Sequence, residues 1–569
     1  MKKILSLALI GVCLAFFSCT ETFELDSLLD DPNNPTPETA DLESLYSSTQ
    51  LGFGGFLSSP QAFTMQLSRQ VAFTAGNDYQ TAFTPTNFDG IWATAYSAFL
   101  PDAKAVIDLA EPTGQLFHVG TSKIMQAYVL VTLVDLFGDV PFDEACQGID
   151  VISPSAQSGE SVYAAAWGLA NEGIADLTAN EAAAPALDIM YGGSTAGWTA
   201  AANSLLMKIA TNTRDFAAFD TLVAAGGFIS SNAGDWQFEY GSNREDPDSR
   251  HPLYVDSYET TDGDYQSNWM MWAMTEDKDN ADPRARAYFN RQVPEVPLDN
   301  PNRFDCIFSV LPDAALTPDH YLDCNPNMPY CVGSLSQGYY GRDHGNGNGI
   351  PPDGDIRTVY GVYPAGGKFD NDIFAGVQNS GVDGALGAGI HPIITNFMLN
   401  FYQAEMAAVQ GNTAVAREQL EAGVRNSITK ATDFISRDQA SLDEVIATDL
   451  VTGEEIFGSV LLETIDTMTT LYVAEVLERF DNASDIMEVI ALEQLIASYG
   501  NGIEGFNMIR RTARPTTIQP AILTSAGTMI RSALYPAVFV NLNSTAEQKS
   551  VLDQVFWDTQ PANLGACFN

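Results

Sequence analysis

The chain has 569 residues, of which 72 are acidic and 27 are basic, so its formal net charge is −45. A surface of this charge repels nucleic acid and anionic lipid headgroups, and we therefore expect no nucleic-acid partner.

Residues 1–18 are typical of a secretory leader. Lys2 and Lys3 precede an apolar run over residues 4–17, which is too short to span a bilayer as a stable helix. The run ends in Ser18-Cys19, which resembles a bacterial lipobox, where the cysteine becomes the lipid-modified first residue of the mature chain. We expect a lipid anchor on Cys19 to be the only membrane contact, and the alternative is an ordinary leader with an incidental cysteine.

Helical patterning dominates after a tether. Residues 19–39 are acidic and rich in proline, which predicts an extended segment. We assign residues 40–215 to an N-terminal helical part, because apolar side chains recur every three or four residues over 92–110 and 123–137. A further helix pair is indicated over 160–177 and 197–215.

Residues 216–393 break this pattern, because loop-forming and aromatic residues replace the periodic stripes. A compact domain rarely carries so long an irregular stretch without a use. We expect ligand binding on this insertion and on the early loop near Asn77, and the alternative is an ordered structural cap.

Residues 394–569 return to helical patterning. The clearest pair runs over 399–409 and 413–428, with Gly411 and Asn412 between the two helices, and a last pair is indicated over 484–499 and 503–511. We predict an all-α fold, a tetratricopeptide-like solenoid of about four helix pairs with a large loop-rich insertion.

Six strings occur in order along the chain: DPNNPT at 31–36, LVDLFGDVPF at 133–142, DPR at 282–284, RTVYGVYPAGGKFD at 357–370, RRT at 510–512, and YP at 535–536 leading to VFWD at 555–558. Together they resemble the SusD/RagB family of outer-membrane lipoproteins, over almost the whole mature chain.

The resemblance implies a function and a set of partners. It implies an outer-membrane protein facing the cell exterior, which binds a glycan or another nutrient oligomer and catalyses nothing. It also implies a partner, a TonB-dependent barrel transporter of the SusC-like kind, on which the lipoprotein sits as a lid.

Three loops carry the residue types that bind sugars. Flat aromatic faces cover the apolar patches of a sugar ring, while amides, carboxylates and arginine take its hydroxyls. The candidate ligand-binding residues are Asn77, Asp78, Tyr79, Trp269, Trp272, Tyr339, Tyr340 and Arg342. Core packing is the alternative for each set.

A glycine-rich loop has part of the spacing of a calcium loop. Counted from His344, the candidate ligands Asn346, Asn348 and Asp355 stand at the third, fifth and twelfth positions. Histidine is a poor ligand for a hard cation, so an ordinary glycine-rich turn is the alternative. We expect no required cofactor, with Ca²⁺ as an optional ligand here.

Catalytic motifs are missing from the sequence: there is no G-x-S-x-G, H-E-x-x-H or Walker loop. We therefore expect no enzyme. A cell-surface glycoside hydrolase is the alternative, and a non-catalytic protein-interaction scaffold is the third candidate.

Turn residues between Cys324 and Cys331 suggest a small disulfide loop, with buried free thiols as the alternative.

Overall fold

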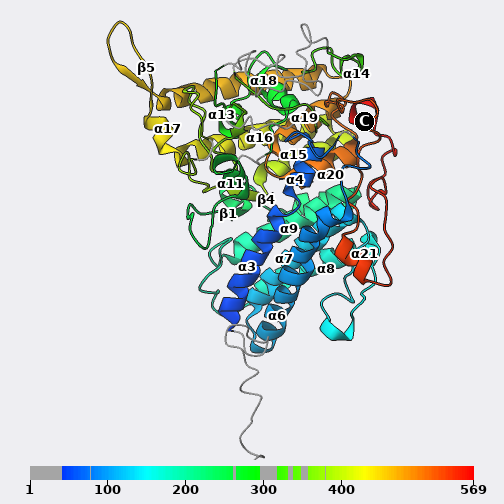
Figure 1. Cartoon of the computed structure of the whole chain (residues 1–569). Coiled ribbons are helices and arrows are strands. Elements are labelled where there is room, and N and C mark those ends of the chain that lie inside the picture. The colour runs from blue at the N-terminus through cyan, green and yellow to red at the C-terminus, as the bar shows by residue number, and fades with distance from the viewer. Residues whose placement is uncertain are drawn as a thin grey trace, which may run out of the picture.

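The computed structural model describes residues 41–76, 78–260, 264–294, 317–330, 338–347, 356–377 and 380–569. Helices α3 (Leu42–Ser58), α6 (Leu100–Ala110), α7 (Leu116–Phe137) and α8 (Gly159–Ala179) lie in one half of the molecule (Figure 1). The shorter helices α4 (Gln61–Leu67) and α5 (Asp89–Ala93) connect α3 to α6.

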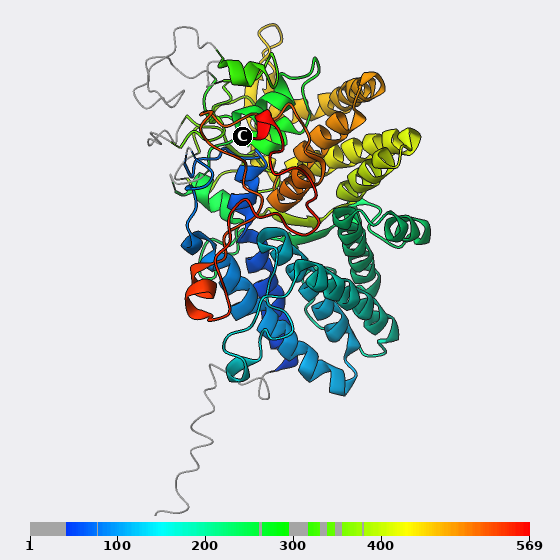
Figure 2. The ribbon, with the colours of Figure 1, turned by 90° about the vertical axis from the view of Figure 1, so that its right-hand side faces the viewer.

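In the described part of the chain, four helix pairs form the scaffold. They are α7 with α8, α9 (Thr195–Thr213) with α10 (Phe216–Ala225), α15 (Asn396–Val409) with α16 (Thr413–Asp433), and α18 (Ile465–Asn482) with α19 (Ile486–Ala497). Figure 2 shows the pairs stacked in chain order, from blue and cyan to orange. Contacts of α8 with α9, of α9 with α15 and of α15 with α19 join successive pairs. The predicted all-α solenoid of helix pairs is confirmed.

The first pair packs closely because glycines face each other. A Cβ atom added at Gly173 of α8 would come within 2.7 Å of the Gly120 carbonyl of α7. Helix α7 ends at Gly138, whose positive φ of 81° suits the residue after a helix. On the returning helix, the Ser158 hydroxyl accepts a hydrogen bond from the backbone N–H of Ser161 and caps α8.

Helix α7 is long and apolar enough to cross a membrane by length and composition, but 89% of its apolar window is buried inside the protein. It is therefore the central core helix of the first pair.

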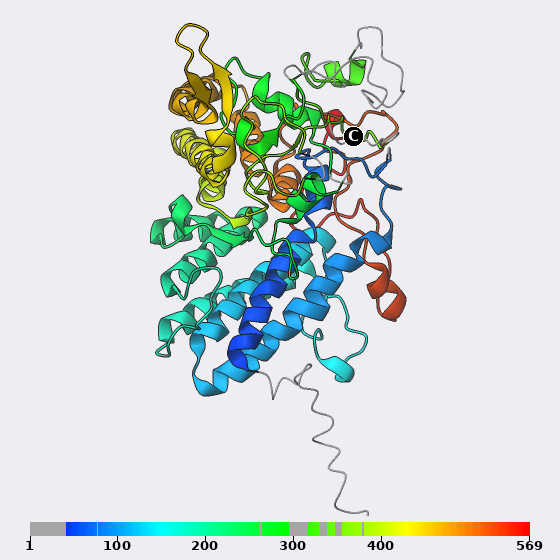
Figure 3. The ribbon, with the colours of Figure 1, turned by 60° about the vertical axis from the view of Figure 1, so that its left-hand side comes forward.

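The described part of the insertion consists of short elements packed on the scaffold (Figure 3). They are β1 (Trp236–Glu239), α11 (Pro252–Tyr258), α12 (Asn268–Thr275), α13 (Ala285–Tyr288), β2 (Phe289–Asn290), α14 (Asp319–Leu322), β3 (Val359–Tyr360) and β4 (Ile390–Ile394). Strands β1 and β4 form one antiparallel pair, and β2 and β3 form another. The predicted range 216–393 begins with α10, which belongs to the second helix pair.

The C-terminal part adds elements that the sequence patterns did not indicate. Helix α18 was not predicted, and neither were α17 (Gln439–Asp443) and the hairpin of β5 (Val445–Thr448) with β6 (Glu455–Phe457). Helix α20 (Gly502–Thr512) packs on α4, and α21 (Ala537–Leu542) precedes the C-terminal segment.

A disulfide joins Cys324, just after α14, to Cys567 near the C-terminus, across 243 residues. The predicted Cys324–Cys331 loop is therefore wrong, because folding brings α14 against the chain end rather than closing a local turn. Cys146 is a free thiol.

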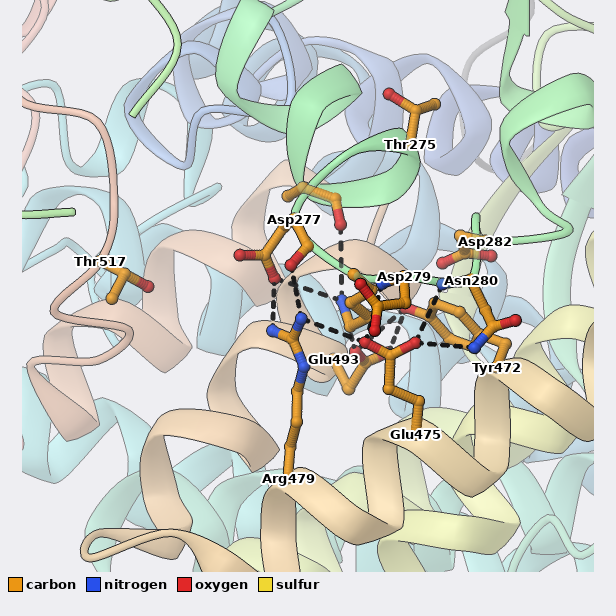
Figure 4. A network of polar contacts seen from close by, with 12 residues as sticks. Thr275, Asp277, Asp279, Asn280, Asp282, Tyr472, Glu475, Arg479, Glu493 and Thr517 are labelled. Atoms are coloured by element: carbon orange, nitrogen blue, oxygen red, sulfur yellow. Dashed lines mark hydrogen bonds and ion pairs between the residues drawn. The ribbon is translucent and has the colours of Figure 1, made fainter. Parts of the chain in front are cut away.

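An ionic network fixes the loop between α12 and α13 to α18 and α19 (Figure 4). Arg284 donates to Asp282 at 2.9 Å and to Glu493 at 3.2 Å, and all three side chains are fully buried. Arg479 donates to Asp277 at 2.7 Å. The DPR string at 282–284 therefore serves the architecture, because each buried charge has an opposite partner.

Candidate functional site

The early loop places one of its candidate residues in the core. Tyr79 is only 1% exposed, and its hydroxyl lies 2.6 Å from Nε2 of His344. Arg69 also donates to this hydroxyl, at 3.2 Å. Asp78 is exposed and accepts a hydrogen bond from the Gln80 backbone at 2.7 Å, whereas Asn77 lies outside the described residues.

The two candidate tryptophans of α12 are also core residues. Trp269 is fully buried, and its indole N–H donates to the Thr517 carbonyl at 3.0 Å. Trp272 is only 5% exposed. Neither ring presents a face on which a ligand could stack.

The third set is buried as well. Tyr339 packs under the Arg291 guanidinium at 5.0 Å, and burial raises the pKa of its phenol to about 12. Tyr340 is fully buried, and the Arg342 guanidinium lies 4.4 Å from the centre of the Tyr265 ring.

The structure thus brings the three segments that carry the candidates next to one another, through contacts that include the neighbouring residues Asn268 and His344, but it turns the aromatic rings of the candidates inward. The Asn268 backbone N–H at the start of α12 donates to the Arg342 carbonyl at 3.0 Å, and Tyr79 meets His344. A ligand-binding role for these residues stays a prediction, and their burial does not support it because stacking needs an exposed ring face.

Two of the three candidate calcium ligands, Asn348 and Asp355, lie outside the described residues. Asn346 is buried, with 1% of its surface exposed. Among the described residues no cluster of three His, Cys, Asp or Glu side chains could hold a metal ion. The optional calcium site stays a prediction.

A groove of about 420 Å³, here called the Trp167 groove, lies between α8, α9 and the C-terminal segment. One face of α8 lines it with positions 160, 163, 164 and 167, which are neighbours on a helix surface because they are three and four residues apart. Helix α9 contributes Ile209, Ala210 and Thr213, and Asp215 and Phe556 complete the lining.

Trp167 is distinguished by its exposure. All seven tryptophans of the chain lie in the described residues, and the other six are buried, with at most 8% of their surface exposed. Trp167 is half-buried, and Phe556 in the same groove is 38% exposed. This groove therefore offers two partly exposed aromatic rings on which a ligand could pack.

A second groove, here called the Phe142 groove, has a volume of about 600 Å³ and lies between α6, α7 and the loop after α7. Its floor is aliphatic, with Leu100, Ile107 and Leu130, and its rim carries charges of both signs from Lys104 and Asp143. Among the described residues that line it, Phe142 is the single aromatic side chain.

Comparison with known proteins shows which family the chain is similar to. A SusD-like family model, described as "Starch-binding associating with outer membrane", matches residues 33–301. A solved SusD-like structure from Bacteroidetes superposes with a TM-score of 0.61 at 17% identity, covering 92% of this chain and 100% of that chain. The resemblance to the SusD/RagB family is confirmed.

Further solved SusD homologues share the fold of this chain. A SusD/RagB family protein from Bacteroides thetaiotaomicron superposes with a TM-score of 0.61 at 15% identity, covering 92% of this chain and 100% of that chain. A chitin-binding SusD homologue from Flavobacterium johnsoniae gives a TM-score of 0.56 at 15% identity, with 91% of this chain and 100% of that chain covered. Among curated proteins none matches this chain.

Proposed function

We propose that this SusD-like protein is a lipoprotein of the outer membrane that captures an oligosaccharide at the cell exterior and leaves its bonds intact. The observation that carries the proposal is the superposition of over nine-tenths of the chain on SusD homologues, one of them described as chitin-binding. The match to a family model for starch binding at the outer membrane supports it.

The stacked helix pairs suit this role because each pair is braced by its neighbours, which gives a rigid support for a binding site. Cys19 carries the anchor in this proposal, and residues 19–39 give the body reach from the bilayer. The captured oligosaccharide then passes to a TonB-dependent barrel transporter.

Binding and catalysis are separated by one experiment. The mature chain with Cys19→Ser is run through native gels that contain starch, chitin derivatives, other neutral polysaccharides or acidic polysaccharides, and each mixture is analysed for shorter products. Retarded migration without product is expected. Shortened chains would establish the glycoside hydrolase alternative, and free migration in every gel would favour the protein-interaction scaffold.

Anchoring and delivery need their own measurement. In cells that express the full chain, labelled fatty acid should enter the protein and the protein should sediment with outer membranes, whereas the Cys19→Ala variant should do neither. A barrel transporter should co-purify with the anchored protein from detergent extracts. An unlabelled wild-type chain, or one that purifies without a barrel, would contradict this part of the proposal.

A further inference from the structure

The Trp167 groove combines the two kinds of surface that a sugar ring requires. Trp167 and Phe556 offer partly exposed rings, while the side chain of Glu160 is exposed to solvent and lines the edge of the groove. Ala164 and Ala210 are small, so a flat ligand can approach the helices closely. The volume of about 420 Å³ is within the range of roughly 300–1,000 Å³ that is usual for small-molecule sites.

The rings are held in place before any ligand arrives. Val555, Trp557 and Asp558 are buried, with 5% exposure or less, so the segment is anchored on both sides of Phe556 while Phe556 itself stays 38% exposed. The Phe556 ring packs edge-on against Tyr163 of α8, with ring centres 5.0 Å apart. Tyr163 lies one helical turn before Trp167, whose partly buried side chain packs against the hydrophobic core, so both rings are carried by packed parts of the scaffold.

We propose that the Trp167 groove is a glycan subsite that takes one pyranose ring of a neutral oligosaccharide. The indole of Trp167 stacks on the C–H face of the ring, Phe556 covers its edge, and Glu160 accepts hydrogen bonds from its hydroxyls. The inference rests on the proposed function, for which it supplies a place and a ligand class.

Charge selects a neutral ligand. Among the described residues that line the groove none is basic, while Glu160 and Asp215 are both acidic. Asp215 already uses one oxygen to accept from the Ala218 backbone at 3.0 Å, which leaves the other for a hydroxyl donor. Uronate or sulfate groups would find no cationic partner there and would meet the repulsion of a chain with net charge −45.

The larger Phe142 groove fits a sugar less well. Its floor is made of branched aliphatic side chains, which offer no flat face, and Lys104 on its rim already pairs with Asp108 at 2.6 Å. The apolar C–H face of a pyranose packs best on a flat aromatic ring, and the Trp167 groove supplies two partly exposed rings against one, Phe142, in the larger groove.

The test measures binding of chitohexaose, cellohexaose and maltohexaose by calorimetry, with an oligogalacturonate as the anionic probe. We expect Trp167→Ala to raise the Kd for the bound neutral oligomer about tenfold or more, and Phe556→Ala to raise it about threefold or more. Phe457→Ala is the matched control, because Phe457 on β6 is 42% exposed and lies outside the groove; it should leave the Kd unchanged.

Tryptophan fluorescence gives a second readout. Because the other six tryptophans are buried, the change of emission on ligand binding should come from Trp167 and disappear in Trp167→Phe. That variant keeps a flat ring, so it should fold as the wild type does and still bind. If Trp167→Ala fails to fold, Phe556→Ala and the fluorescence of Trp167→Phe decide the matter.

The outcomes distinguish failure of the proposed subsite from failure of the proposed function, oligosaccharide capture. Binding by the wild type that survives both groove substitutions, or that is lost in Phe142→Ala instead, overturns the site while oligosaccharide capture stands. Binding confined to the oligogalacturonate overturns the neutral ligand class. Failure to bind any probe here, together with free migration in every polysaccharide gel, overturns the proposed function itself.

Discussion

The indole N–H of Trp557 donates a hydrogen bond of 3.0 Å to the carboxylate of Asp135, although 422 residues separate them in sequence. The same carboxylate accepts from the Tyr163 hydroxyl and from the Asn507 amide, and Lys208 lies 3.8 Å from it. One buried carboxylate of α7 thus ties together α8, α20 and the segment that carries Phe556.

Removing this carboxylate should weaken the whole scaffold. Asp135→Ala leaves three buried donors without their acceptor, and we expect a loss of about 3–5 kcal/mol in the free energy of unfolding, measured by urea denaturation. Asp108→Ala is the control, because the Asp108 side chain is 60% exposed and its pair with Lys104 should contribute about 1 kcal/mol or less. Equal losses in the two variants would contradict the role of Asp135.

The burial of the α12 tryptophans makes a prediction about stability. Trp269→Ala should cost about 3–5 kcal/mol, because it removes a fully buried ring and the hydrogen bond to Thr517. Trp167→Ala should cost about 1 kcal/mol, since that ring is only half-buried. Chemical denaturation of the two variants checks this, and the reverse ranking would place Trp269 at the surface.

Trp269 and Trp272 show why an exposed aromatic surface for sugar binding could not be predicted from the sequence. Ser267 caps α12 by accepting from the Met270 backbone at 3.3 Å, and the short helix then directs both Trp269 and Trp272 into the core. The local sequence predicts aromatic side chains among loop-forming residues. Which side of a short helix is buried depends instead on residues far away in the sequence, such as Thr517, whose carbonyl accepts from Trp269.

Reduction of the disulfide should also destabilise the protein. Cys567→Ser frees the chain end from α14, and we expect a loss of about 2–5 kcal/mol in the free energy of unfolding. Peptide mapping without reduction should recover the fragments of Cys324 and Cys567 as one linked species. A Cys324–Cys331 link would contradict the structure.

Acid should weaken the fold through buried histidine. Burial lowers the pKa of His391 to about 3 from its usual 6.5, so the unfolded chain takes up a proton near pH 6.5 while the folded chain does not. The stability that His391 supplies at neutral pH is therefore lost as the pH falls from 6.5 toward 3. Between pH 7 and pH 4, wild type should lose about 3 kcal/mol more than His391→Met in urea denaturation. Identical pH profiles would show that His391 takes up its proton in the folded chain as readily as in the unfolded one.

The solenoid could be predicted because its signal is local. Apolar spacing and the break at Gly411-Asn412 mark α15 and α16 without knowledge of the rest of the chain. The same spacing marks α8, yet the binding candidate Trp167 on that helix was missed, because helical periodicity does not show which exposed aromatic side chain faces a groove. Phe556 was part of a recognised string, but only the fold brings it to α8.

The central claim is that sugar rings stack in the Trp167 groove and leave chemically unchanged. The most direct measurement titrates the mature protein with an oligosaccharide of the polysaccharide that retards it in native gels, follows tryptophan emission, and then recovers the ligand for mass analysis. We predict a saturable change of emission that Trp167→Phe abolishes, with every ligand molecule recovered at its original length. An unchanged emission at saturation, or recovery of shortened oligomers, would contradict the account.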